Sequence, residues 1–225
     1  MIDWGWIADH AGVIAERVLQ HLELAGIALV VGFALSFALA VWSLGRPRVY
    51  RVVTTLAAIL YTIPSLAMFY LFISITGISV LTAEIPLVLY TLVIFVRNIV
   101  LGFESVSADV RDAADGMGFS RRERFRSVEL PIAIPLILAG LRLATVSTIG
   151  LVTITGILGS SLGGLGHFFF ENQFFFTEVF VGAIGSIAIA FLADIGITRI
   201  QRRLTPWAQP MVFEARGRAI PFVPR

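Results

Sequence analysis

The 225-residue sequence contains no cysteine, and all 17 of its basic residues are arginine, so lysine is absent as well. Without cysteine the chain cannot form disulfides, iron–sulfur clusters or thiolate zinc sites. Its three histidines lie far apart, without the spacing of metal ligands, so we expect no metal site and no cofactor. A nucleotide-binding P-loop, G-x-x-x-x-G-K-S/T, needs a lysine to reach the phosphates. If ATP drives this protein, we expect another subunit to hydrolyse it, and this chain to be non-catalytic.

Charge is also scarce, since only 14% of the residues are charged and 57% are hydrophobic. A soluble domain averages about 25% charged residues. A bilayer removes the need for so much polar surface, because its hydrocarbon core solvates apolar side chains. The arginines lie in short segments between apolar runs, as expected for a multi-pass membrane protein, so we do not expect nucleic acid as a partner.

Apolar stretches long enough to span a membrane, which takes about 20 residues, occur five times. We therefore predict an all-α, polytopic membrane protein with five transmembrane helices, roughly at residues 22–44, 52–76, 85–103, 132–158 and 179–198.

The chain divides into three parts around these helices. In residues 1–21, Trp4 and Trp6 stand among polar residues, which is typical of an extracytoplasmic interfacial helix. Residues 22–205 form the transmembrane domain. Residues 206–225 contain four prolines and are predicted to be a flexible cytoplasmic tail.

Arginine placement predicts the orientation of the spans. Arginines are concentrated in the first interhelical loop, in the third loop and in the tail. The positive-inside rule therefore places the N-terminus outside and the C-terminus inside, in the plasma (inner) membrane. An odd number of spans leads to the same conclusion.

The third loop, 104–131, is unusually long for a compact protein. It is predicted to form two short helices. Gly118 ends the first, because glycine tolerates the left-handed conformation of a helix stop. Ser120 and Glu123 form a capping box for the second, which we expect to end at Pro131, before the fourth span.

The first of these short helices carries small residues that suit close docking. We expect Ala113 and Ala114 to be exposed and to enter a groove on a partner protein. Asp109, Asp112 and Asp115 are placed to pair with arginines of that partner. The alternative is an amphipathic loop that lies on the membrane surface.

The order of residues in this loop resembles the EAA loop of binding-protein-dependent ABC importers. That signature is E-A-A, three residues, Gly, nine residues, then I-x-L-P, and the spacing here fits it throughout, with aspartate for glutamate and valine for isoleucine. In that family the elbow is the coupling helix that docks on the ATPase. The matching residues are Asp112, Ala113, Ala114, Gly118, Val128, Leu130 and Pro131.

Other stretches resemble permeases for glycine betaine, carnitine and choline. They are the T-I-P-S-L-A run within 61–67, the segments 96–98 and 140–142, the G-G-L-G motif at 163–166, and 204–207. Ser160 and Ser161 stand where that branch usually has Gly and Ala.

The resemblance implies a type I importer permease for quaternary ammonium osmoprotectants. It also implies a set of partners: two ABC ATPase subunits, an extracytoplasmic substrate-binding protein, a second or paralogous permease copy, and membrane lipid. Methionine-importer permeases share the five-span plan and the loop, so a permease for methionine or another amino acid stays open. An ion-coupled secondary transporter is less favoured, because we find no internal repeat and no midplane carboxylate.

Two groups of polar residues within the spans are candidates for the translocation path. Pro64 lies in the second span, where it is expected to kink the helix, and Thr62 and Ser65 flank it. The alternative is a packing kink satisfied by neighbouring helices. The second group shares one face of the fourth span and serves either the path or helix packing: Thr145, Thr148 and Thr155.

Three charged residues lie within the spans towards their cytoplasmic ends. Such charges usually face the protein interior and pair with one another. We predict that Asp194 pairs with Arg97 or with Arg142. The alternative is that the arginines extend to the lipid headgroups.

Overall fold

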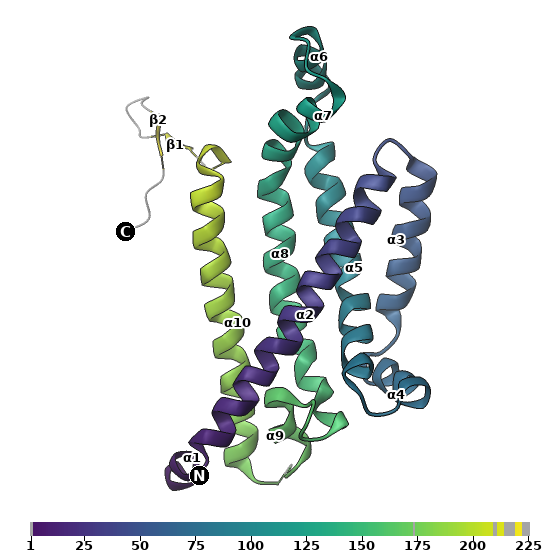
Figure 1. The fold of residues 1–225 in the computed structure, drawn as a ribbon. Coiled ribbons are helices and arrows are strands. Elements are labelled where there is room, and N and C mark those ends of the chain that lie inside the picture. The colour runs from purple at the N-terminus through teal and green to yellow at the C-terminus, as the bar shows by residue number, and fades with distance from the viewer. Residues whose placement is uncertain (1, 173, 209–210, 214–218, 222–225) are drawn as a thin grey trace.

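The computed structural model describes residues 2–172, 174–208, 211–213 and 219–221, and it is a bundle of helices (Figure 1). The all-α fold class predicted from the sequence is confirmed. Its long helices are α2 (Ala11–Ser43), α5 (Val80–Glu104), α8 (Leu130–Val152) and α10 (Phe176–Leu204).

Shorter elements connect and flank these helices. One end of the bundle carries α6 and α7, and the opposite end carries α1, α4 and α9 (Figure 1). The shorter helices are α1 (Trp4–Asp9), α3 (Pro47–Thr62), α4 (Ser65–Thr76), α6 (Ala108–Gly116), α7 (Arg121–Arg124) and α9 (His167–Phe170). A π-helical turn covers Phe125–Glu129, and 3₁₀ turns cover Thr153–Leu158, Gly164–Gly166 and Pro206–Ala208.

Four of the described helices are long and apolar enough to cross a membrane, and there are five if the bent pair α3 and α4 forms one span. Three run at Ala11–Ser43, Val80–Glu104 and Phe176–Leu204, and the fourth begins at Arg121 and includes α8. The predicted five spans therefore require α3 and α4 to act together. Which side of the membrane each terminus occupies stays a prediction.

The first long helix begins much earlier than the sequence suggested. We assigned residues 1–21 to a separate interfacial segment, but α2 already starts at Ala11, and only α1 is separate. The early start has a physical reason: the polar residues Arg17 and His21 are buried against other parts of the chain, so this stretch packs as helix within the protein.

The predicted single second span is instead broken. Helices α3 and α4 meet at an angle of 94°. Pro64 has no N–H to donate and restricts the residue before it, so Ile63 is extended, with φ −68° and ψ 128°. The result is a sharp break and not the kink we expected. The carbonyl of Leu60, four residues before the proline, accepts a bond from the Ile63 N–H at 3.3 Å.

In the C-terminal tail, two short antiparallel strands follow the 3₁₀ turn: β1 (Met211–Phe213) and β2 (Ala219–Pro221). The remaining residues of this segment, 209–210, 214–218 and 222–225, lie outside the described part of the chain. The flexibility that we predicted for 206–225 stays a prediction.

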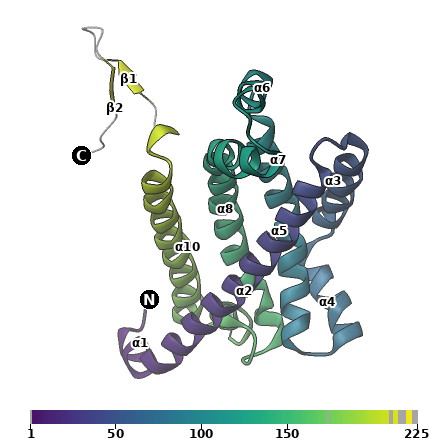
Figure 2. The same ribbon diagram turned by 45° about the horizontal axis from the view of Figure 1, so that its top comes forward.

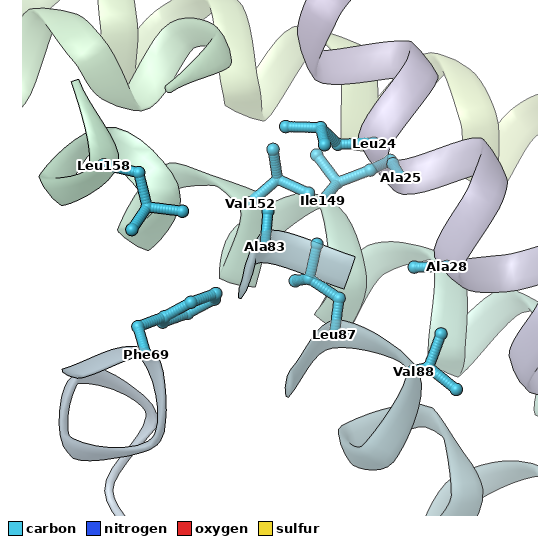
Figure 3. Packing of buried hydrophobic residues seen from close by; sticks show 10 residues of the cluster. All are labelled: Leu24, Ala25, Ala28, Phe69, Ala83, Leu87, Val88, Ile149, Val152 and Leu158. Atoms are coloured by element: carbon cyan, nitrogen blue, oxygen red, sulfur yellow. The ribbon is translucent and has the colours of Figure 1, made fainter. Parts of the chain in front are cut away.

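Helix α5 is the centre of the bundle, and two hydrophobic clusters form along it. At one end, α2, α4, α5 and α8 surround a cluster that includes Leu24, Phe69, Leu87 and Ile149 (Figure 3). At the elbow end, the second cluster is formed around residues such as Phe103, which is 1% exposed.

Small residues let these helices approach closely, as is common where lipid gives no hydrophobic drive for helix association. A Cβ added at Gly32 of α2 would lie 2.0 Å from the hydroxyl oxygen of Thr91 in α5. At Gly140 of α8 it would lie 2.5 Å from the Cβ of Asn98, also in α5. The segments 96–98 and 140–142, which carry the family resemblance, therefore pack against each other.

We predict that Gly140→Ala destabilises the protein by about 1–3 kcal/mol, because the new methyl group overlaps Asn98. Thermal unfolding of the purified full chain in detergent measures this as a lower midpoint. Gly150→Ala is the matched control: Gly150 lies in the same helix, and nothing stands within 4 Å of its added Cβ. Equal midpoints for the two variants would show that the α5–α8 approach is not tight at Gly140.

Candidate functional site

The loop with the family signature folds as an elbow of two short helices at one end of the bundle (Figure 1). Ser107 caps α6 by accepting a hydrogen bond from the Val110 N–H at 3.3 Å. Gly118, two residues after the last helical residue, stops the helix with a φ of +84°, a conformation that favours glycine. The Gly118 N–H donates to Asp115 O at 3.0 Å, and the Phe119 N–H donates to Ala114 O at 3.2 Å. This pair of bonds is the Schellman stop, in the place predicted for it.

The second arm of the elbow begins with the predicted capping box. The Ser120 N–H donates to Glu123 Oε2 at 2.8 Å, and the Glu123 N–H donates to Ser120 Oγ at 3.3 Å. We expected this helix to end at Pro131, but it does not. It continues from α7 through the π turn into α8, with the Leu130 N–H bonded to Phe125 O. This wider turn comes directly before a proline that has no N–H to donate, so the helix passes through without a break.

Only part of the predicted docking face is exposed. Asp112 and Ala113 face outwards, but Ala114 is only 1% exposed, which corrects our expectation that both alanines are available to a partner. Ala114 belongs to the interior of the elbow, where its carbonyl closes the helix stop. The other signature residues, Val128, Leu130 and Pro131, are half-buried at the base of α8.

A network of ion pairs holds the elbow together. Arg124 contacts Asp115 and also donates to Glu129 Oε1 at 3.0 Å. Arg111 lies 3.6 Å from the same Glu129 oxygen and donates to Phe103 O at 2.7 Å. We expected Asp115 to pair with a partner protein, but its partner is Arg124 of its own chain.

This network joins four parts of the chain: α6, α7, the π turn and the end of α5. Aromatic packing strengthens the same joint, because the rings of Phe103 and Phe125 stack with centroids 5.2 Å apart. Asp109 and Asp112 make no ion pair within the part of the chain that the structure describes. The elbow is thus a braced unit with an exposed acidic edge.

The first group of predicted path residues lies at the break between α3 and α4. Thr62 and Pro64 are exposed and Ser65 is half-buried. The Thr62 hydroxyl donates to Ile59 O at 2.7 Å, and the Tyr90 hydroxyl of α5 donates to the carbonyl of Ile63. Tyr90 therefore stabilises the break, which lies at the surface of the chain.

The second group, Thr145, Thr148 and Thr155, is buried in the interior, at 5%, 1% and 0% exposure. These threonines do not share a surface with Thr62 and Pro64. Thr155 Oγ1 lies 2.8 Å from the carbonyl oxygens of Val152 and Leu162. Their burial favours helix packing, the alternative that we considered for them.

Of the three charges within the spans, two lie in contact. Arg142 Nε is 2.8 Å from Asp194 Oδ1 and Arg142 Nη2 is 3.0 Å from Asp194 Oδ2, a two-bond contact that joins α8 to α10. Arg97 is exposed beside Tyr50 and has no ion-pair partner among the described residues. Asp194 therefore lies with Arg142 and not with Arg97.

At the opposite end of the bundle, a clamp that the sequence did not reveal holds the G-G-L-G segment. The fully buried His21 ring lies 3.0 Å from Ile149 O through Nε2, and its Nδ1 accepts from the Leu165 N–H at 3.3 Å. Arg17 contacts Ser160 O, and Gln20 donates to Ser161 O at 3.1 Å. The histidine and the glycines were each visible in the sequence, but no local pattern pairs residues more than 100 positions apart.

Glycine is needed in this segment because backbones meet there. A Cβ at Gly166 would lie 2.0 Å from Thr153 O, and one at Gly156 would lie 2.3 Å from Gly166 O.

Glu84 is another residue that sequence reasoning missed, since the third span was drawn from residue 85. Its side chain is 7% exposed, and neither carboxylate oxygen has a hydrogen-bond partner in the described residues.

Spanning helices around a central α5, with an exposed helix–glycine–helix elbow between α5 and α8, define the class of transport permease subunits. The sequence profile described as "Binding-protein-dependent transport system inner membrane component" matches residues 31–206, and the chain belongs to this family. It is accordingly a multi-pass inner-membrane protein, as we predicted.

Similar proteins are named permeases of osmoprotectant systems. The osmoprotectant import permease protein OsmW of Salmonella typhimurium is 33% identical over 209 residues, covering 89% of this chain and 96% of the relative. The glycine betaine/carnitine/choline transport system permease protein OpuCB of Bacillus subtilis is 28% identical over 203 residues, covering 89% and 93%. These relatives belong to the branch that the sequence motifs resemble.

Solved structures with this fold come from ABC transporters. The MetNI methionine ABC transporter, in inward-facing conformations, superimposes with a TM-score of 0.76 at 19% identity, covering 88% of this chain and 98% of that one. An amino acid ABC transporter gives a TM-score of 0.66 at 16% identity, covering 92% and 99%. They confirm the type I importer permease fold.

We predict that Arg142→Asp and Asp194→Arg each lower the yield of folded protein severalfold, because each leaves like charges facing one another within the membrane. The double exchange should recover a large part of that yield, measured by size-exclusion chromatography in detergent. The control combines Asp194→Arg with Arg97→Asp, and this combination should not recover the yield that Asp194→Arg loses. A double exchange no better than the worse single variant would contradict the pairing.

Proposed function

We propose that this chain is the transmembrane permease subunit of an ATP-driven importer for quaternary ammonium osmoprotectants such as glycine betaine, choline and carnitine. The observation that carries the proposal is the braced elbow, with the EAA-type spacing, in a chain whose relatives are named osmoprotectant permeases. Within this proposal the elbow faces the cytoplasm, with the N-terminus outside and the C-terminus inside.

Two ATPase subunits dock on the elbows of two permease copies. Asp112 and Ala113 present a small, acidic, exposed face, which suits an arginine-lined groove. Asp109 lies one turn before Ala113 on the same face and extends its negative charge. Closure of the ATPases moves the elbows, and the bracing network passes that movement to α5 and α8. An extracytoplasmic binding protein delivers the substrate.

The path forms between two copies, because one bundle of this size encloses only half of it. The break at Thr62, Pro64 and Ser65 is on the surface of the single chain, where a second copy can complete a passage. Tyr61 is 48% exposed beside this break, and an aromatic face attracts quaternary ammonium ions. We therefore place the path at the break, and we assign the buried threonines of the fourth span to packing.

We predict ATP-dependent uptake of labelled glycine betaine or choline by vesicles that contain the chain with its cognate ATPase and binding protein. Uptake should stop when the ATPase is omitted, and a tenfold excess of methionine should leave it unchanged. Inhibition by methionine, or an active complex that imports neither osmolyte, would overturn the substrate class and favour an amino acid permease. Uptake that persists without the ATPase would overturn the ATP-driven mechanism itself.

A further inference from the structure

A cavity of about 950 Å³ lies at the elbow end of the bundle. Its walls come from the α2–α3 loop, the end of α5 and the elbow, which lie at the same end of the molecule (Figure 2). The volume is near the top of the range of roughly 300–1,000 Å³ for small-molecule sites.

The cavity is strongly basic. Its lining includes two glutamates, Glu104 and Glu129, and five arginines: Arg46, Arg111, Arg121, Arg122 and Arg124. Arg111 and Arg124 are already paired with Glu129. Arg46, Arg121 and Arg122 have no carboxylate partner among the described residues, and the one hydrogen bond of the Arg46 side chain goes to Trp42 O at 2.7 Å. A guanidinium without a carboxylate partner can donate two parallel hydrogen bonds to a phosphate group.

The lining of the cavity also includes apolar and aromatic residues, which we call its apolar wall. It consists of residues from the end of α2 and the loop after it, the start of α3, the last turns of α5 and the π turn: Val41, Leu44, Tyr50, Val100, Phe103 and Phe125. A ligand that fits both walls has an anionic head and an apolar body.

The position along the helices matches the depth of lipid headgroups. Only residues 44–46 connect the end of α2 to the start of α3, so this loop cannot extend far from the membrane surface. Trp42, next to the loop, is 54% exposed, and tryptophan is enriched at the headgroup level. We therefore expect Arg46 to lie at the level of the lipid phosphates.

We propose that this cavity binds an anionic phospholipid, with its phosphate on Arg46, Arg121 and Arg122 and the first carbons of its acyl chains against the apolar wall. Basic pockets between transmembrane helices are known to hold anionic headgroups. The bound lipid links the α2–α3 loop to the elbow. The site is separate from the substrate path and does not depend on which solute is carried.

Native mass spectrometry of the purified full chain tests the proposal, with phosphatidylglycerol and phosphatidylcholine of the same acyl chains as probes. We expect phosphatidylglycerol to bind at least about tenfold more tightly, and Arg46→Gln with Arg122→Gln to reduce this affinity by roughly 10- to 30-fold. The matched control is Arg48→Gln with Arg51→Gln, because both arginines are exposed on α3 near the same loop and neither lines the cavity. The control should bind like the unaltered chain.

Equal binding of the two lipids by the unaltered chain, a measurement that needs no variant, would overturn the proposal. An equal loss in the pocket and control variants would also overturn it, since the effect would then be general surface charge. Inorganic phosphate at millimolar concentration should not displace the lipid, and displacement would instead indicate a free-anion site. The transporter assembled with its ATPase should keep its phosphatidylglycerol. Loss of the lipid on assembly would overturn the proposal, because it would show that ATPase side chains fill the cavity.

Discussion

The close approach of helices to α5 is the constraint on which the rest of this structure depends. Inside a bilayer, apolar side chains gain little by leaving lipid for protein, so helices associate through tight contact and polar bonds. Gly32 and Gly140 leave room for Thr91 and Asn98, which lets α2 and α8 pack on the same central helix. Residues outside the membrane can then be placed precisely, because the helices that carry them are fixed.

The elbow uses a different set of forces, since it lies beyond the helix ends. Backbone caps shape its two arms, and the Arg124–Glu129–Arg111 ion pairs fasten them to the end of α5. Exposed ion pairs contribute little when isolated, but Glu129 is largely buried, with 12% of its side chain exposed, and it is shared by two arginines. The same arrangement leaves Arg46, Arg121 and Arg122 without carboxylate partners in the part of the chain that the structure describes. The ion-pair network and the basic cavity therefore result from one distribution of charge.

Local signals in the sequence predicted the elbow well. Gly118 stops α6 through its positive φ, and Ser120 and Glu123 cap α7, because both devices act within a few residues. The sequence could not show that Ala114 faces inwards or that Asp115 pairs with Arg124, since these depend on how the two arms fold back on each other. The apolar runs predicted the spans. The start of α2 could not be predicted, because it depends on contacts of Arg17 and His21 with distant parts of the chain.

The break at Pro64 shows the same limit. A proline within an apolar run is compatible with a kink or with a full break, and the sequence alone does not decide between them. The 94° break is stabilised by the Tyr90 hydroxyl, which satisfies the Ile63 carbonyl from a helix 27 residues away. Likewise, Asp194 had two candidate partners in the sequence, and the packing of α8 on α10 places it with Arg142.

In the proposed function, the bracing network transmits movement from a docked ATPase to the spanning helices. The most direct test is the number of ATP molecules hydrolysed per substrate imported by reconstituted vesicles, compared between Glu129→Gln and the control Glu104→Gln. Glu104 lines the same cavity but forms no ion pair in the described part of the chain. We expect normal ATPase binding and a severalfold higher ATP cost per substrate for Glu129→Gln, and an unchanged cost for Glu104→Gln. An unchanged cost for Glu129→Gln would contradict this expectation.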